Sequence, residues 1–202
     1  MLDDLDFTVA AAHEAGHVVV AHALGRDVLQ VSFGRAELPH DHPGLPPELQ
    51  ALSNGRTLVG PLWEERLSEQ FRDCEPFGDI QIAWLRAEMV MCYAGWIAEQ
   101  ALVGSYRPVG AYADWLKAVT AANLLGLAEM ADGHWRISDT ISAELERIGR
   151  LIIEDLRPGL VRLAETFATI APAEIDEPAI RAMLADLGLA RASHVHLLEP
   201  LG

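Results

Sequence analysis

Two histidines and a glutamate near the start of the chain form the pattern His-Glu-x-x-His, in the stretch His13-Glu14-Ala15-Gly16-His17. On a helix, side chains four residues apart lie one turn apart on the same face. His13 and His17 can therefore direct two imidazoles at one point, and two neutral ring nitrogens at about 2 Å from a shared ion make half of a tetrahedral zinc site. Glu14 is rotated by about 100° around the helix. We expect it to act as a general base on water at the open metal position rather than as a ligand.

The residues around this HExxH pattern predict a buried helix. Residues 9–12 and 18–23 are almost uniformly apolar, Asp6 or Thr8 is expected to cap the start, and Gly25 is expected to follow the end. Buried imidazoles and carboxylates need partners, because an unpaired polar group in a core is costly. A metal ion would satisfy all three side chains at once. The alternative is a helix with two ordinary histidines and an incidental glutamate.

A catalytic zinc site usually has three protein ligands and one open position, so a third donor is required. The position six residues after His17 is Ala23 and not a histidine, and His22 points away from the face that the first two ligands share. The remaining candidates are acidic: Glu37, Glu88, Glu99 and Asp114. Asp114 is favoured because it lies where a loop runs into a predicted helix and no neighbour gives it another task. From the residues alone, it is explained equally well as a first-turn aspartate stabilised by the helix dipole.

The elements that must position these groups are mostly helices. A long second helix is expected over residues 80–103 with Asp79 as its cap, and the other helices are expected over 111–130, 138 or 140 to 155, 160–169, and from an N-cap at Asp176 to residue 187. Residues 28–33 and 57–63 are rich in β-branched and aromatic side chains and predict a small strand pair. The expected fold class is therefore mainly α, in one domain over residues 1–202, with a possible helical subdomain over 138–188.

Proline, glycine and charge mark the connections. Residues 34–56 are expected to form a loop, 64–73 a charged helical segment, 104–110 and 132–133 turns, and 189–202 a frayed tail. The loop histidines His40 and His42, and the tail histidines His194 and His196, are expected to be solvated rather than metal-bound. Gly16 beside His17 removes bulk where another backbone segment or a substrate could pass.

Charge and composition exclude several classes of function. The formal net charge of −15 over 202 residues disfavours nucleic acid and anionic membrane surfaces as partners. The two cysteines, Cys74 and Cys92, lack the paired spacing of a metal site. The acidic start does not resemble a signal peptide, and no run of about 18 uncharged apolar residues predicts a membrane span. A cytoplasmic location is the default expectation.

Several motifs together resemble the peptidase domain of the FtsH family of ATP-dependent zinc metalloproteases. The His-Glu-Ala-Gly-His stretch is the first of them. The others follow in the same order as in the family, over about residues 8–188: Gly55-Arg56-Thr57-Leu58-Val59-Gly60, Tyr93-Ala94-Gly95-Trp96-Ile97-Ala98-Glu99-Gln100, Gly110-Ala111-x-x-Asp114-x-x-x-Ala118, Leu160-x-x-Leu163-Ala164-Glu165 and Ile175-Asp176.

The resemblance implies a site and also shows departures from the family. It implies that His13, His17 and Asp114 hold Zn²⁺, that Glu14 is the base, and that Glu99 supports a ligand from behind. The chain has no Gly-x-x-x-x-Gly-Lys-Ser/Thr loop, so we do not expect it to bind ATP itself. We also expect no counterpart of the family's membrane anchor, and Trp96 stands where the family has arginine. A homo-oligomer and a separate ATPase partner are what the resemblance suggests.

The sequence therefore predicts a zinc metalloendopeptidase. Its expected substrates are peptides or unfolded polypeptides, because the chain carries no unfoldase of its own, and a strand near residues 57–62 could hold an extended peptide by backbone pairing. The alternative is a catalytically silent FtsH-like protein that binds polypeptides or a partner. A structural zinc is a third reading, and it needs a fourth protein ligand such as Glu99 or a loop histidine.

Overall fold

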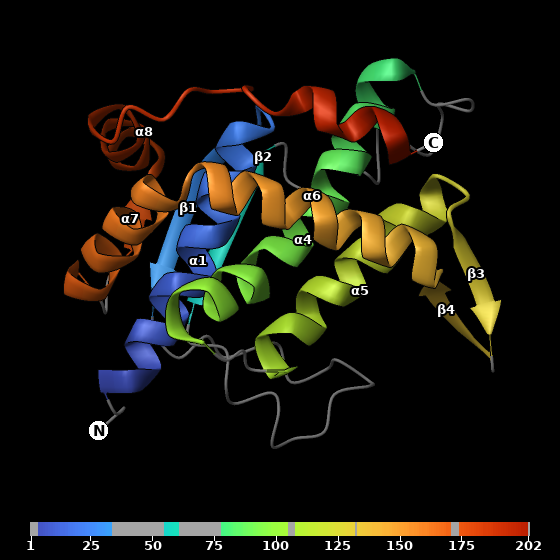
Figure 1. Ribbon diagram of the computed structural model, residues 1–202, viewed down its shortest axis with the longest axis horizontal. Coiled ribbons are helices and arrows are strands. Elements are labelled where there is room, and N and C mark those ends of the chain that lie inside the picture. Colours follow the sequence, from blue (N-terminus) through green and yellow to red (C-terminus); the bar gives the residue numbers. More distant parts are fainter. Residues whose placement is uncertain are drawn as a thin grey trace.

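The computed structural model describes residues 4–33, 55–60, 78–104, 108–131, 133–170 and 174–201. These residues form a mainly helical fold with two small antiparallel sheets (Figure 1). The elements in chain order are α1 (Asp4–Ala23), β1 (Asp27–Phe33), β2 (Gly55–Gly60), α4 (Asp79–Val103), α5 (Pro108–Leu124), β3 (Ala128–Ala131), β4 (His134–Ile137), α6 (Asp139–Asp155), α7 (Arg157–Ile170), β5 (Glu174–Asp176), α8 (Glu177–Asp186) and the 3₁₀ helix η1 (Val195–Leu201).

Helices α1 and α4 pack against each other at the centre of the molecule, and α6 crosses in front of them in the view of Figure 1. Gly16 makes their close approach possible. A Cβ atom at Gly16 would lie 2.6 Å from the carbonyl oxygen of Ala94 and 2.6 Å from Cβ of Ala98. The expectation that another backbone segment passes Gly16 is therefore correct, and that segment is α4.

The first sheet has three strands in the order β2-β1-β5, all antiparallel. In the central strand β1, Val31 lies opposite Thr57 on one side and opposite Ile175 on the other. The predicted strand pair corresponds to β1 and β2, and the three-residue β5 was not expected. Strand β2 lies at the end of this order, so no strand in the described part of the chain pairs with its outer edge.

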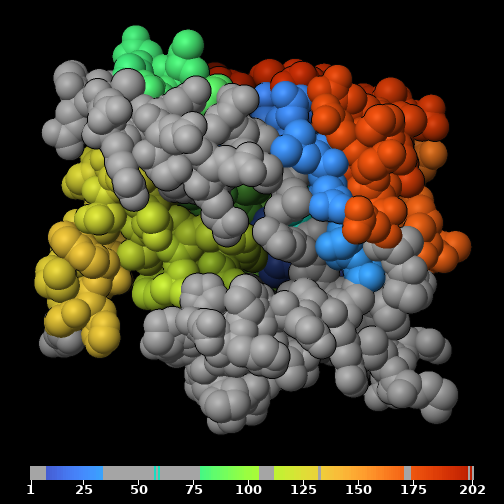
Figure 2. Space-filling model, turned by 180° about the vertical axis from the view of Figure 1, so that it is seen from behind, coloured from blue at the N-terminus to red at the C-terminus, as the bar shows by residue number. Residues whose placement is uncertain are grey.

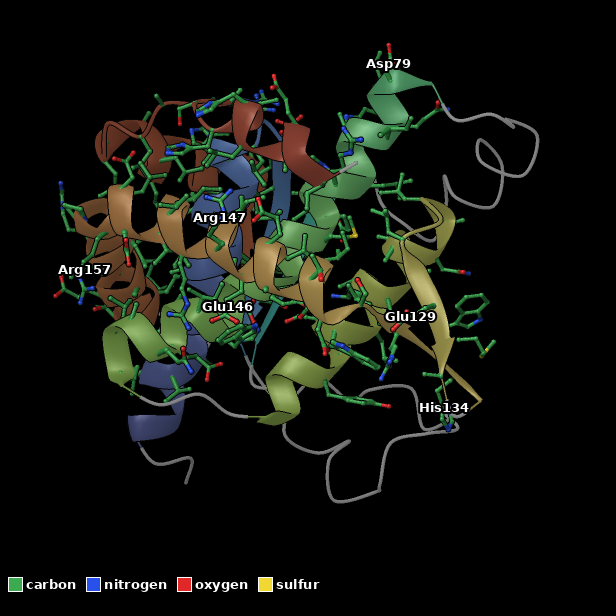
Figure 3. The ribbon with its side chains drawn as sticks, turned by 45° about the vertical axis from the view of Figure 1, so that its right-hand side comes forward. Asp79, Glu129, His134, Glu146, Arg147 and Arg157 are labelled. Carbon is green, nitrogen blue, oxygen red and sulfur yellow. The ribbon has the colours of Figure 1, made fainter. Side chains whose placement is uncertain are left out.

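Two of the predicted helix caps are confirmed. The Ser138 side chain accepts a hydrogen bond from the backbone N–H of Ile141 at the start of α6, and Asp176 accepts one from Ala179 at the start of α8. The predicted cap at Asp79 is wrong, because Gly78 is the N-cap and its N–H donates to the side chain of Gln81. Asp79 instead lies in the first turn, at the outer end of α4 (Figure 3).

The predicted helix over 111–130 is wrong at its end. Helix α5 stops at Leu124, and Gly126 adopts a φ of +70°, which glycine reaches without the penalty that a Cβ would bring. The chain then forms the β3–β4 hairpin, with a second left-handed glycine, Gly133, in the connection between its strands. Helical periodicity overestimated this helix because the apolar residues after Gly126 serve a hairpin.

The predicted frayed tail is also wrong. The backbone N–H of Ala192 donates to the carbonyl of His22, and that of His194 donates to Ala23, so the segment is attached to the end of α1. Leu198 and Leu201 of η1 are buried in the core. Burial of two leucine side chains gives this tail a fixed place that local sequence does not indicate.

The loop expected over 34–56 lies outside the described residues except for its last two positions, and the helical segment expected over 64–73 lies wholly outside them. None of the helices in the described part of the chain carries an apolar stretch long enough to cross a bilayer.

Candidate metal centre

Helix α1 supplies two buried imidazoles one turn apart. His13 and His17 are 8% and 6% exposed. Their Nε2 atoms lie 3.0 Å apart, and the two rings meet edge to face with an interplanar angle of 77°. The i, i+4 spacing therefore produces the shared point that the sequence predicted.

Asp114 comes from α5 and completes the cluster. Its Oδ2 atom lies 3.0 Å from Nε2 of His13 and 3.0 Å from Nε2 of His17. Asp114 is buried and lies in the second turn of α5, not in the first turn where a helix dipole alone would favour it. Among the described residues, these three side chains form the cluster that could hold a metal ion.

The other nitrogen of each ring is held by α4. His13 Nδ1 lies 2.6 Å from Oε1 of Glu99, and His17 Nδ1 donates to the carbonyl oxygen of Met91 at 2.9 Å. A carbonyl and a carboxylate accept hydrogen bonds, so each Nδ1 carries the proton of a neutral ring. Each Nε2 then presents a lone pair, which is the arrangement that histidine ligands show in metal sites. Glu99, predicted as a supporting residue, makes this contact.

Gly95 on α4 leaves the space that the His13 ring occupies. A Cβ atom at this position would lie 2.4 Å from Cε1 of His13 and 2.5 Å from its Nε2. A side chain here would displace the ring, because a buried site has little room for adjustment. Sequence reasoning missed this role, although Gly95 is part of the motif over residues 93–100 that resembles the family.

The donor set suits a cation. Three electron-pair acceptors converge within 3.0 Å of one another in a buried site, where their mutual repulsion is little screened. Burial opposes a charge on His13, but hydrogen bonds to Asp114 and Glu99 outweigh it and raise the pKa of His13 to about 10. In the absence of a metal ion, a proton on His13 therefore supplies the positive charge in the cluster. Ligand atoms of a tetrahedral zinc lie about 3.3 Å apart, so the residues fit Zn²⁺ with a small expansion.

Asp114 uses its two oxygens differently. Oδ2 faces the two imidazoles, and Oδ1 lies 3.3 Å from the ammonium Nζ of Lys117. Although burial raises the pKa of the Asp114 carboxyl, the charges of His17 and Lys117 lower it well below its usual value. Asp114 is therefore an ionised donor that presents one oxygen to the metal position.

Glu14 lies beside the cluster and does not join it. Its side chain is 4% exposed, and its Oε2 atom accepts a hydrogen bond of 2.5 Å from the hydroxyl of Thr57 on β2. This placement agrees with a base and not with a fourth ligand. The part played by Thr57 was missed, because a contact between residues 43 positions apart leaves no periodic signal in the sequence.

The competing candidates lie elsewhere or are already paired. Glu88 forms an ion pair with Arg26 at 3.6 Å, and His22 donates to the carbonyl oxygen of Leu189. His194 is not solvated as predicted but is buried and contacts Asp155. Figure 3 shows another histidine, His134, at the tip of the β3–β4 hairpin and away from α1. Glu37, His40 and His42 lie outside the described residues.

Seen from behind, atoms of α1 are visible at the bottom of a hollow between α5 and β1 (Figure 2). Helix α1 carries both imidazoles and Glu14, and α5 carries Asp114. The cluster therefore combines side chains from these two helices.

A scan against protein-family models found no match to this chain, and a search of curated proteins found no relative. The functional assignment consequently depends on the side chains described above.

Proposed function

We propose that this protein is a zinc-dependent metallopeptidase that resembles the FtsH peptidase domain. The observation that carries the proposal is the convergence of three buried acceptor atoms, from His13, His17 and Asp114, next to a separate buried carboxylate. A metal in a hydrolase needs three protein ligands, an open position and a base that is not itself a ligand. His13, His17 and Asp114 would supply the ligands, and Glu14 would be the base.

The residues of the chain have distinct roles in the proposed reaction. His13, His17 and Asp114 hold the ion, while Glu99 and the Met91 carbonyl fix the orientation of the two rings. When bound, zinc supplies a Lewis acid and lowers the pKa of a coordinated water to about 7. Glu14 accepts the proton of the attacking water and passes it to the leaving amine.

Among the described residues, the cluster lacks the fourth protein ligand of a structural zinc site. A structural site is normally closed by a fourth protein ligand. In the part of the chain that the structure describes, the cluster has three members, and Glu99 is engaged with the far side of the His13 ring. An ion held by these three side chains would keep one position for the water that hydrolysis requires.

The edge strand β2 supports an extended peptide as the substrate. Its outer edge has no strand partner among the described residues, and Thr57 connects its inner face to Glu14. An extended chain could pair with this edge by backbone hydrogen bonds. Peptides and unfolded polypeptides are the substrates we propose, with a separate ATPase and a homo-oligomer as the partners that the family resemblance suggests.

The substitution Glu14→Gln tests the proposal. The amide keeps the shape of the side chain but cannot take a proton, so we expect one bound zinc per chain and a fall in cleavage of casein and of a quenched fluorescent peptide by at least about 100-fold. Zinc is measured by mass spectrometry of the protein. The exposed Glu165 provides the matched control, Glu165→Gln, with unchanged cleavage.

Equal cleavage by Glu14→Gln and wild type would refute the role of Glu14. A wild-type protein that binds zinc but cleaves neither substrate would favour the silent, polypeptide-binding alternative.

A further inference from the structure

The carboxylate of Glu14 is anchored through one oxygen. Oε2 accepts the hydroxyl proton of Thr57 at 2.5 Å, a short distance of the kind made by an O–H donor and a charged acceptor. Glu14 belongs to α1, the helix that carries both imidazoles, whereas Thr57 belongs to β2. The hydrogen bond therefore links the metal-binding helix directly to the edge strand.

The sheet fixes the position of the Thr57 hydroxyl. Thr57 lies opposite Val31 of the central strand, which is fully buried. Val59, two residues further along β2, is also buried and lies on the same face, because strand side chains alternate. Threonine is β-branched and its χ1 angle is restricted. The donor is thus held by a paired strand and a stiff side chain.

We propose that Thr57 is the positioning residue for Glu14 in the peptidase. By holding Oε2, its hydroxyl leaves Oε1 as the oxygen that takes the proton from the attacking water. This inference rests on the proposed function. Because a peptide substrate would pair with the outer edge of β2, the same strand sets the place of the substrate and of the base, so the two are kept in register with each other.

Two substitutions distinguish the effect of the Thr57 hydroxyl from the effect of the side-chain shape. Thr57→Val keeps the branched shape and removes the donor, and Thr57→Ser keeps the donor. With the zinc-loaded protein and a quenched fluorescent peptide, we expect Thr57→Val to lower kcat about tenfold, with KM within about twofold, since a hydrogen bond to a charged group is lost. Zinc stoichiometry should not change, and Thr57→Ser should restore most of kcat.

A kcat for Thr57→Val within about twofold of wild type would overturn the inference. It would equally be overturned if Thr57→Ser were as impaired as Thr57→Val, because the hydroxyl would then not be the cause.

Binding of acetohydroxamate provides a readout that needs no turnover. This small acid chelates zinc and shares its proton with an adjacent carboxylate, so its affinity reports how well Glu14 is placed. We expect Thr57→Val to weaken acetohydroxamate about tenfold in the wild-type background and not to weaken it further in the Glu14→Gln background. Equal weakening in both backgrounds would show a general structural effect and overturn the inference.

The two proposals can fail separately. A wild-type protein that binds acetohydroxamate but cleaves no peptide would contradict the proposed function. The effect of Thr57→Val on acetohydroxamate affinity, compared between the wild-type and Glu14→Gln backgrounds, would still decide the role of Thr57. A wild-type protein that binds neither zinc nor acetohydroxamate would overturn both.

Discussion

Two clusters in the described part of the chain have a buried histidine in contact with an aspartate, and their surroundings differ. His13 and His194 are 8% and 9% exposed, and their Nε2 atoms lie 3.0 and 3.1 Å from an aspartate oxygen. At His13 the aspartate is buried, and a second imidazole nitrogen lies within 3.0 Å. At His194 the Asp155 side chain is 68% exposed, and the neighbouring His196 ring stacks at 6.3 Å between centroids.

The difference shows that a histidine–aspartate contact does not by itself make a metal site. Around His194, one nitrogen contacts Ser193 Oγ at 2.7 Å and the other contacts an aspartate that water also reaches. Both ring nitrogens of His194 therefore have partners without a bound ion. Around His13, three acceptors meet away from water, and this arrangement suits a cation, either a proton on His13 or a metal ion. The His194 side chain instead links the C-terminal segment to Asp155 at the end of α6, and its backbone N–H donates to Ala23 of α1.

The largest expected effect comes from removing one aspartate of each pair. Asp114→Asn replaces an ionised ligand by a weak neutral donor and should lower zinc affinity by more than about 100-fold. Asp155→Asn should leave zinc affinity unchanged within about twofold. Competition with a chromophoric chelator measures both. Loss of affinity in both variants would mean that the two clusters are not functionally distinct.

A smaller effect is expected behind the ligands, where α4 carries two buried glutamates. Glu99→Gln weakens the acceptor for His13 Nδ1 and should lower zinc affinity about tenfold to 100-fold. Glu88→Gln is the matched control, because it disturbs the ion pair with Arg26 and not the cluster. Glu88→Gln should lower the melting temperature without changing zinc affinity. If Glu88→Gln weakened zinc binding and Glu99→Gln did not, Glu99 would be excluded as a support of the site.

The smallest expected effect is a pH dependence of the metal-free protein. The pKa of His13 is about 10 in the folded state, against an ordinary value of 6.5. Its contribution to stability is therefore complete below about pH 6.5 and is lost as the pH rises towards about 10. We expect the free energy of unfolding to fall by about 1 kcal/mol from about pH 7 to 8, measured by urea denaturation with a chelator present.

Two control variants test whether this fall in the free energy of unfolding with pH arises from the cluster of His13, His17 and Asp114. His13→Asn should remove it, and His194→Asn should keep it. Saturating zinc should also remove it, because the ion replaces the proton. A slope that survives in His13→Asn would assign the titration to another group.

Much of the fold and part of the site could be predicted from local pattern. The helix that carries His13 and His17, the long helix up to its left-handed Gly104, and the caps at Ser138 and Asp176 all follow from spacing and capping chemistry. The hairpin after Gly126 and the docked C-terminal segment were mispredicted. Their stability comes from cross-strand pairing and from burial against distant residues, which local periodicity does not contain.

By itself, the sequence determined that two imidazoles and a glutamate share one helix. It also placed the two imidazoles on one face, because residues four apart lie on the same side of a helix. Tertiary structure decided the rest of the centre. Asp114 is 97 residues from His17 and reaches it because α4 packs between distant parts of the chain, with Gly95 clearing space for the His13 ring. Contacts of this kind depend on how helices approach one another, and that distance is set by side chains across the whole core.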